Sequence, residues 1–167
     1  MKNFRILYSG GGTLGSVSPL IAIHQFLNSK QIPNPSLWLG TFSGPEKNVV
    51  EDAGIKFEAI ASGKLRRYFD WQNFIDVINI IIGFFQALYY ILKFKPDVIL
   101  TAGSFVAVPV AWAGWLSSTP VIIHQQDISV GLANKLMAPV AKKITVALEK
   151  SLQDFKKDKV VLVGNPV

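Results

Sequence analysis

The feature that most constrains the fold is an alternation of short apolar runs with longer helical patterns. The short runs, rich in Val and Ile, predict strands at 4–9, 36–40, 57–60, 98–101, 121–124, 144–147 and 160–163. The intervening segments predict helices at 19–29, 46–53, 71–93, 108–116, 130–138 and 150–155. Nearly continuous apolar strands separated by helices are typical of a parallel sheet covered on both faces. The sequence therefore predicts a Rossmann-like α/β domain.

Polar or glycine-rich segments follow three of the predicted strands. They span residues 10–18, 102–106 and 124–129. In an open parallel sheet, ligands bind beyond the carboxyl ends of the strands. We therefore expect these three segments to form one site.

The first of these segments is a glycine turn between a strand and a helix. Gly10, Gly12 and Gly15 match the G-x-G-x-x-G fingerprint of dinucleotide-binding turns. That fingerprint needs an acid at the end of the second strand, but the nearest acid, Glu46, lies beyond a loop. A P-loop is excluded because no Gly-Lys-Ser/Thr follows. A dinucleotide site and a purely structural turn stay open, and we favour a backbone N–H cradle for another phosphorylated ligand.

Composition bounds the class of protein. A chain of 167 residues, 50% of them hydrophobic, suits one folded domain and excludes disorder. The absence of cysteine excludes disulfides and thiolate metal sites. We expect no secretory signal, because the first apolar run is short and ends at the glycine turn. The net charge of +6 suits nucleic acid, a phospholipid surface or a phosphorylated substrate, and does not choose among them.

The segment 74–92 is almost as long and apolar as a transmembrane helix. Its polar residues share one helical stripe and argue against a free-standing span: Asp76, Asn79 and Gln86, with Gly83 between them. Two interpretations stay open, a helix buried on most sides and a helix whose outer face enters a bilayer surface. The second predicts membrane contacts by Ile81, Phe84, Phe85 and Leu88, with Arg66 and Arg67 as basic neighbours.

Several separated motifs follow one another along the chain. They are GGTLGSVSP at 11–19, GKLRR at 63–67, KPDVI at 95–99, GSFVAVP at 103–109, HQQD at 124–127, GLANK at 131–135 and GNPV at 164–167. In this order and spacing they resemble the motifs of the MurG family of peptidoglycan glycosyltransferases. Members of that family add N-acetylglucosamine to lipid I and so make lipid II.

The resemblance implies that residues 1–167 are the N-terminal half of a two-domain GT-B enzyme. The C-terminal domain, which binds the donor UDP-N-acetylglucosamine, would lie outside this chain, and the chain alone would be inactive. The implied partners are lipid I, an anionic membrane surface, and the enzyme's own C-terminal domain or a donor-binding subunit, but no nucleic acid. The implied location is peripheral, at the cytoplasmic face of the bacterial inner membrane. No metal is expected, since no Asp-x-Asp or His/carboxylate cluster is present. The resemblance implies no cofactor, because UDP-N-acetylglucosamine is a substrate.

Two other functions stay open. One is a non-catalytic membrane-anchor subunit of a split glycosyltransferase, and the other is a nucleotide-dependent oxidoreductase domain. The resemblance places acceptor or diphosphate contacts at Gly12, Thr13, Leu14, Gly15, Ser16, Phe105, Gln125, Gln126 and Asn134.

The chain departs from the family pattern at four of these positions. Leu14 replaces a glycine, Ser16 the loop histidine, Phe105 a tyrosine and Gln125 the glutamate of HEQN. Inverting transfer needs a base at the acceptor hydroxyl, and neither Ser16 nor Gln125 supplies one near neutral pH. His124 and Asp127 are the remaining candidates, and Asp127 is favoured because a carboxylate at a strand end faces a cleft with least rearrangement. A structural His124 and a helix-capping Asp127 stay open.

Overall fold

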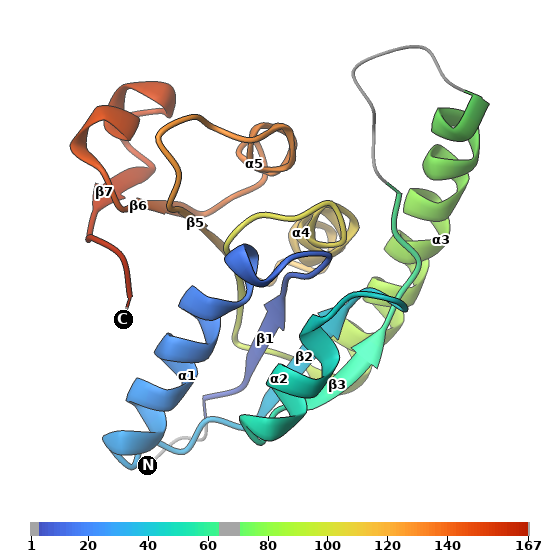
Figure 1. The fold of residues 1–167 in the computed structure, drawn as a ribbon, viewed down its shortest axis with the longest axis horizontal. Helices are drawn as coiled ribbons and strands as arrows, with labels where there is room; N and C mark the ends of the chain where they lie inside the picture. Colours follow the sequence, from blue (N-terminus) through green and yellow to red (C-terminus); the bar gives the residue numbers. More distant parts are fainter. Residues whose placement is uncertain (1–3, 64–70, 167) are drawn as a thin grey trace.

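A seven-stranded parallel sheet forms the centre of the molecule, with strand order β3-β2-β1-β4-β5-β6-β7 (Figure 1). It is seen in a computed structural model that describes residues 4–63 and 71–166. The strands are β1 (Ile6–Ser9), β2 (Ser36–Gly40), β3 (Lys56–Ala59), β4 (Val98–Thr101), β5 (Val121–Gln125), β6 (Lys143–Val146) and β7 (Val160–Leu162). The helices are α1 (Ser18–Ser29), α2 (Glu46–Asp52), α3 (Trp71–Phe94), α4 (Ala107–Leu116) and α5 (Leu132–Met137), with 3-10 turns η1 (Leu14–Ser16) and η2 (Glu149–Asp154).

The strand order reverses direction beside β1. The chain runs outward from β1 through β2 to β3, then returns to place β4 on the other side of β1. In the register, Leu7 lies between Leu37 of β2 and Ile99 of β4. Such a switch point opens a crevice at the carboxyl ends of the two central strands, where doubly wound sheets bind ligands.

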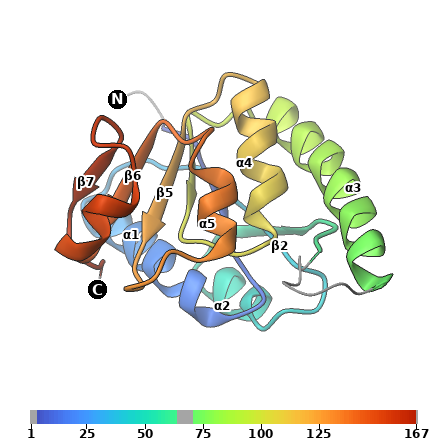
Figure 2. The same ribbon diagram turned by 90° about the horizontal axis from the view of Figure 1, so that it is seen from above.

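Alternate residues of the central strands β2, β1, β4 and β5 contribute to two separate cores. Ile6 and Tyr8 of β1 pack with α1 and α2 on one face, whereas Leu7 packs with α3, α4 and α5 on the other (Figure 2). All three side chains are buried. The strands are therefore apolar at successive positions because both faces are covered, which confirms the predicted fold class.

The structure differs from the expected elements mainly after β5. The helix predicted at 130–138 begins only at Leu132, because Gly131 has extended backbone angles and serves as its N-cap. Asp127 therefore does not cap this helix. The helix predicted at 150–155 is the 3-10 turn η2, and the short turn η1 inside the glycine segment was not expected.

Candidate functional site

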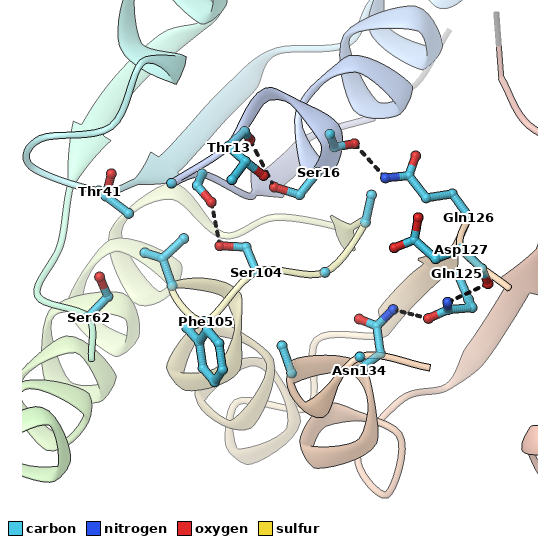
Figure 3. A pocket seen from close by; sticks show the side chains of 18 residues that line it. Thr13, Ser16, Thr41, Ser62, Ser104, Phe105, Gln125, Gln126, Asp127 and Asn134 are labelled. Carbon is cyan, nitrogen blue, oxygen red and sulfur yellow. Dashed lines mark hydrogen bonds between the residues drawn. The ribbon is translucent and has the colours of Figure 1, made fainter. Parts of the chain in front are cut away.

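A cavity of about 420 Å³ opens at the carboxyl ends of β1, β4 and β5 (Figure 3). The loops after these three strands supply most of its wall, as the sequence predicted. From the expected acceptor-binding residues, the lining includes Gly12, Thr13, Gly15, Ser16, Phe105, Gln125, Gln126 and Asn134. Leu14 is about half exposed and does not belong to the lining. The cavity also includes Thr41, Ser62 and Ser104, which sequence reasoning did not single out.

The glycine loop, residues 10–17, is fixed by contacts that need its glycines. Gly12 has φ of 77°, a left-handed conformation that side chains rarely adopt. A side chain at Gly10 would meet the Ser16 carbonyl at 2.7 Å. Ser16 is buried, and its hydroxyl donates to the Thr13 carbonyl at 3.4 Å. The serine that replaces the family histidine is therefore turned into its own loop.

A buried acid lies behind the glycine loop. Glu46 at the start of α2 accepts hydrogen bonds from the Gly12 N–H at 3.1 Å and the Thr41 N–H at 2.7 Å. The Thr41 hydroxyl donates to the same carboxylate at 2.6 Å. A dinucleotide site would need this acid free for ribose hydroxyls. Glu46 is fully buried and occupied, which argues against the oxidoreductase interpretation.

The loop after β4 is held in a strained conformation. Ser104 has φ of 109°, a region almost restricted to glycine, and follows Gly103 at 94°. The Ser104 hydroxyl donates to the Gly11 carbonyl at 2.8 Å and so joins this loop to the glycine loop. No pattern in the sequence predicts this bond, because it joins two loops that are distant along the chain.

Two side-chain amides, those of Gln125 and Asn134, hold the part of the cavity wall that follows β5. The Gln125 side-chain N–H donates to the carbonyls of Asp127 at 2.8 Å and Ser129 at 3.2 Å. Its oxygen accepts from the Asn134 amide N–H at 2.6 Å. This leaves the buried Asn134 Oδ1 without a partner among the described residues, in the wall of the cavity (Figure 3). Such an acceptor is suited to a hydroxyl or N–H group of a ligand.

The two candidate bases lie in different places. Asp127 is exposed and belongs to the cavity lining. His124 points to the opposite side of β5, where its ring nitrogens contact the Thr145 hydroxyl at 2.9 Å and the Asn165 side-chain oxygen at 3.1 Å. Burial lowers the pKa of His124 below its ordinary value, and the bond to Asn165 opposes this effect. The structure does not bring His124 into the cavity, which favours the structural interpretation of this residue.

Helix α3 carries its polar stripe inward. Gln86 accepts a hydrogen bond from the Ala61 N–H at 2.7 Å, and Gly83 lies against the Ala61 carbonyl. Gly63 packs in the same way against the backbone of Asp76. The helix therefore docks on the segment after β3 through its polar and glycine positions.

The opposite face of α3 is apolar and exposed. Two of the four predicted membrane residues, Ile81 and Phe85, belong to it at 52% and 63% exposure. The other two, Phe84 and Leu88, are half-buried because they pack against the core beneath α3, and they do not belong to the exposed face. The rest of the exposed apolar face is formed by Val77, Ile78, Ile82, Tyr89 and Leu92. Arg66 and Arg67 lie outside the described residues.

Within the described residues, one helical segment, Asp76–Phe94, is long and apolar enough to cross a membrane, judged by length and composition alone. Only 17% of that segment is buried.

Helix α4 also exposes large apolar side chains, at Trp112, Trp115 and Leu116. In the described part of the chain, no group of three or more His, Asp or Glu side chains is placed to hold a metal ion.

Comparison with known proteins relates this fold to glycosyltransferases. A model of the glycosyltransferase family 28 N-terminal domain matches residues 6–146. The chain is 42% identical, over 163 residues, to proteins of Clostridium kluyveri and Clostridium tetani named UDP-N-acetylglucosamine--N-acetylmuramyl-(pentapeptide) pyrophosphoryl-undecaprenol N-acetylglucosamine transferase. The alignments cover 98% of this chain and 46% and 45% of these relatives, so the chain spans less than half of their length.

The fold is also similar to that of solved structures. MurG of Acinetobacter baumannii superimposes with a TM-score of 0.79 and 25% identity, covering 97% of this chain and 45% of that protein. A putative UDP-N-acetylglucosamine 2-epimerase from Listeria monocytogenes, at 10% identity and a TM-score of 0.73, covers 99% of this chain and 46% of that protein and shares the fold alone.

Proposed function

Since the chain belongs to the family of glycosyltransferase family 28 N-terminal domains, we propose that it is the acceptor-binding and membrane-binding part of an inverting N-acetylglucosaminyltransferase. The proposed acceptor is lipid I and the donor is UDP-N-acetylglucosamine, as the names of the Clostridium relatives suggest. A donor-binding domain, in the same polypeptide or in a separate subunit, completes the site. The observation that carries the proposal is the cavity in which the predicted loops after β1, β4 and β5 converge.

The proposed acceptor cavity offers two kinds of polar contact. Thr13 and Gly15 line the cavity where the glycine loop enters the 3-10 turn η1, and the backbone N–H groups of this turn would suit the diphosphate of the acceptor. The Asn134 Oδ1, buried and unpartnered among the described residues, suits a hydroxyl or amide N–H of the sugar. Together they fit a ligand that joins a diphosphate to an N-acetylated sugar.

Asp127 is the proposed base. Transfer with inversion requires that the acceptor hydroxyl lose its proton while it attacks the anomeric carbon of the donor sugar. Asp127 is the titratable side chain among the lining residues, whereas Ser16 is buried in the glycine loop and His124 lies outside the cavity. The proton would pass from the acceptor hydroxyl to the Asp127 carboxylate as UDP leaves.

The exposed apolar face of α3 is the proposed membrane contact. Burial of its Ile and Phe side chains would stabilise association by removing apolar surface from water. The net charge of +6 adds attraction to anionic lipid. This arrangement suits a peripheral protein at the cytoplasmic face of the bacterial inner membrane.

The proposal is tested by transfer of labelled N-acetylglucosamine to lipid I, with the donor-binding domain supplied. We expect Asp127→Asn to lower turnover by about two to four orders of magnitude, as loss of a general base does. Binding of a short-chain lipid I analogue to the chain, measured by fluorescence anisotropy, should stay unchanged. Failure of the unaltered chain to bind the analogue would contradict the proposal.

Two other outcomes are informative. Full turnover by Asp127→Asn would remove Asp127 from the mechanism and leave the acceptor site standing. Binding of the analogue without transfer, even beside an active donor domain, would identify a non-catalytic anchor subunit instead.

A further inference from the structure

Glu46 is a buried carboxylate for which the proposed transfer has no use. It is fully inaccessible to solvent and accepts three hydrogen bonds, one from the Gly12 N–H and two from Thr41. It therefore connects the glycine loop to the loop after β2. Both Gly12 and Thr41 also line the cavity.

The surroundings of Glu46 are built to hold this side chain. A side chain at Gly11 or Gly44 would collide with it, so these two glycines leave the space that the carboxylate fills. The ion pairs recorded in the described part of the chain, Lys47–Glu51 and Lys56–Glu58, involve other carboxylates. Among the described residues, hydrogen bonds alone compensate its charge, which a buried anion needs.

This internal anion competes with any anion that enters the glycine loop. The Gly12 N–H already donates to Glu46 at 3.1 Å and is unavailable to a ligand. A phosphate held by the N–H groups of the next two residues would lie within about 10 Å of the carboxylate, by the spacing of consecutive residues. At that distance two negative charges repel each other appreciably, because protein and not bulk water lies between them.

We propose that Glu46 is a specificity-determining residue that weakens the binding of small free anions such as pyrophosphate to the glycine loop. A diphosphate then binds there tightly only when the sugar and lipid attached to it make further contacts in the cavity. The inference rests on the proposed function, because it assumes that the loop receives the diphosphate of the acceptor. It also explains why a glycine loop with the dinucleotide fingerprint need not bind nucleotides.

The test is titration of inorganic pyrophosphate by calorimetry. Glu46→Gln keeps the shape of the side chain and removes its charge, and we expect pyrophosphate to bind on the order of tenfold more tightly than to the unaltered chain. The matched control is Glu51→Gln, which removes the same charge from the exposed side of α2 and should change the affinity little. Equal affinities in the two variants, or weaker binding to Glu46→Gln, would overturn the proposal.

A second measurement does not depend on the stability of Glu46→Gln. In amide NMR spectra of the unaltered chain, saturating pyrophosphate should shift the signals of Thr13 to Gly15 and leave that of Gly12 in place. A large shift at Gly12 would show that the ligand displaces Glu46 and would contradict the inference. The lipid I analogue is measured in parallel, since loss of its binding would defeat the proposed function, whereas the pyrophosphate result decides the role of Glu46.

Discussion

The glycine loop and helix α3 use their polar groups in contrasting ways. In the loop, internal partners such as Glu46, Ser104 and Gln126 hold the backbone beside a cavity that stays open to ligands. In α3, Gln86 and Gly83 contact the backbone of Ala61 and so dock the helix, and the apolar side chains of the opposite face are exposed to solvent. The first region presents polar groups to an open cavity, and the second presents apolar side chains to solvent, which are the surfaces used in the proposed acceptor binding and membrane contact.

The inward face of α3 is tested by Gly83→Ala. In an exposed helix this change stabilises by about 0.5–1 kcal/mol. Here the new methyl group would press on the Ala61 carbonyl, so we expect a loss of about 1–3 kcal/mol in the free energy of unfolding. Urea denaturation measures it, with the exposed Ile82→Ala as the control. A gain in stability would show that α3 does not dock through this contact.

The outward face of α3 is tested by the double variant Ile81→Ser/Phe85→Ser. Burial of each side chain at a bilayer would contribute about 1.5–3 kcal/mol at full burial, so partial insertion predicts at least a tenfold loss of binding. Flotation with phosphatidylglycerol vesicles measures the binding. The control is Phe26→Ser/Phe42→Ser, which replaces two exposed aromatic residues elsewhere on the molecule. Similar losses in both double variants would refute a specific role for α3.

Two substitutions at Ser104 test whether the loop after β4 is strained. Ser104→Ala keeps the strained backbone and loses the bond to Gly11, so we expect a loss of about 1 kcal/mol in stability. Ser104→Gly loses the same bond but relieves the strain, so its stability should lie about 1–2 kcal/mol above that of Ser104→Ala. Thermal unfolding of the two variants measures the difference. Equal stabilities would mean that Ser104 is not strained.

The smallest effect is expected from pH. Burial lowers the pKa of both histidines, His24 and His124, below the ordinary value of 6.5. The unfolded chain therefore binds protons more readily, so stability is fully present above pH 6.5 and falls as the pH drops below it. Denaturation at several pH values measures the slope, and His124→Gln should reduce it. A slope of opposite sign would contradict the buried, neutral state.

The sequence was sufficient to predict the parallel sheet and to predict which loops form the site. Strand positions followed from apolar runs, and parallel order placed their carboxyl ends together. The orientation of His124 was also within reach, because adjacent residues of a strand face opposite sides. Once Gln125 is assigned to the cavity wall, His124 must point away from it.

Other features could not be derived from the pattern. The polar stripe of α3 was visible in the sequence, but its partner is the backbone of Ala61, and no residue type marks that segment as a docking surface. The sequence shows Glu46 as an acid beyond the loop after β2, but its hydrogen bond to Gly12 depends on how that loop folds. The bond from Ser104 to Gly11 likewise joins two loops that are far apart in sequence.

The contact between α3 and residues 61–63 has a mechanical consequence. Ala61 is held by Gln86 and Gly83, and the adjoining Ser62 belongs to the cavity lining. Because α3 contacts this segment at Asp76, Gly83 and Gln86, the helix cannot rotate about its axis without moving the segment. A displacement of α3 would therefore also move residues 61–63, and with them the part of the cavity lining that Ser62 forms.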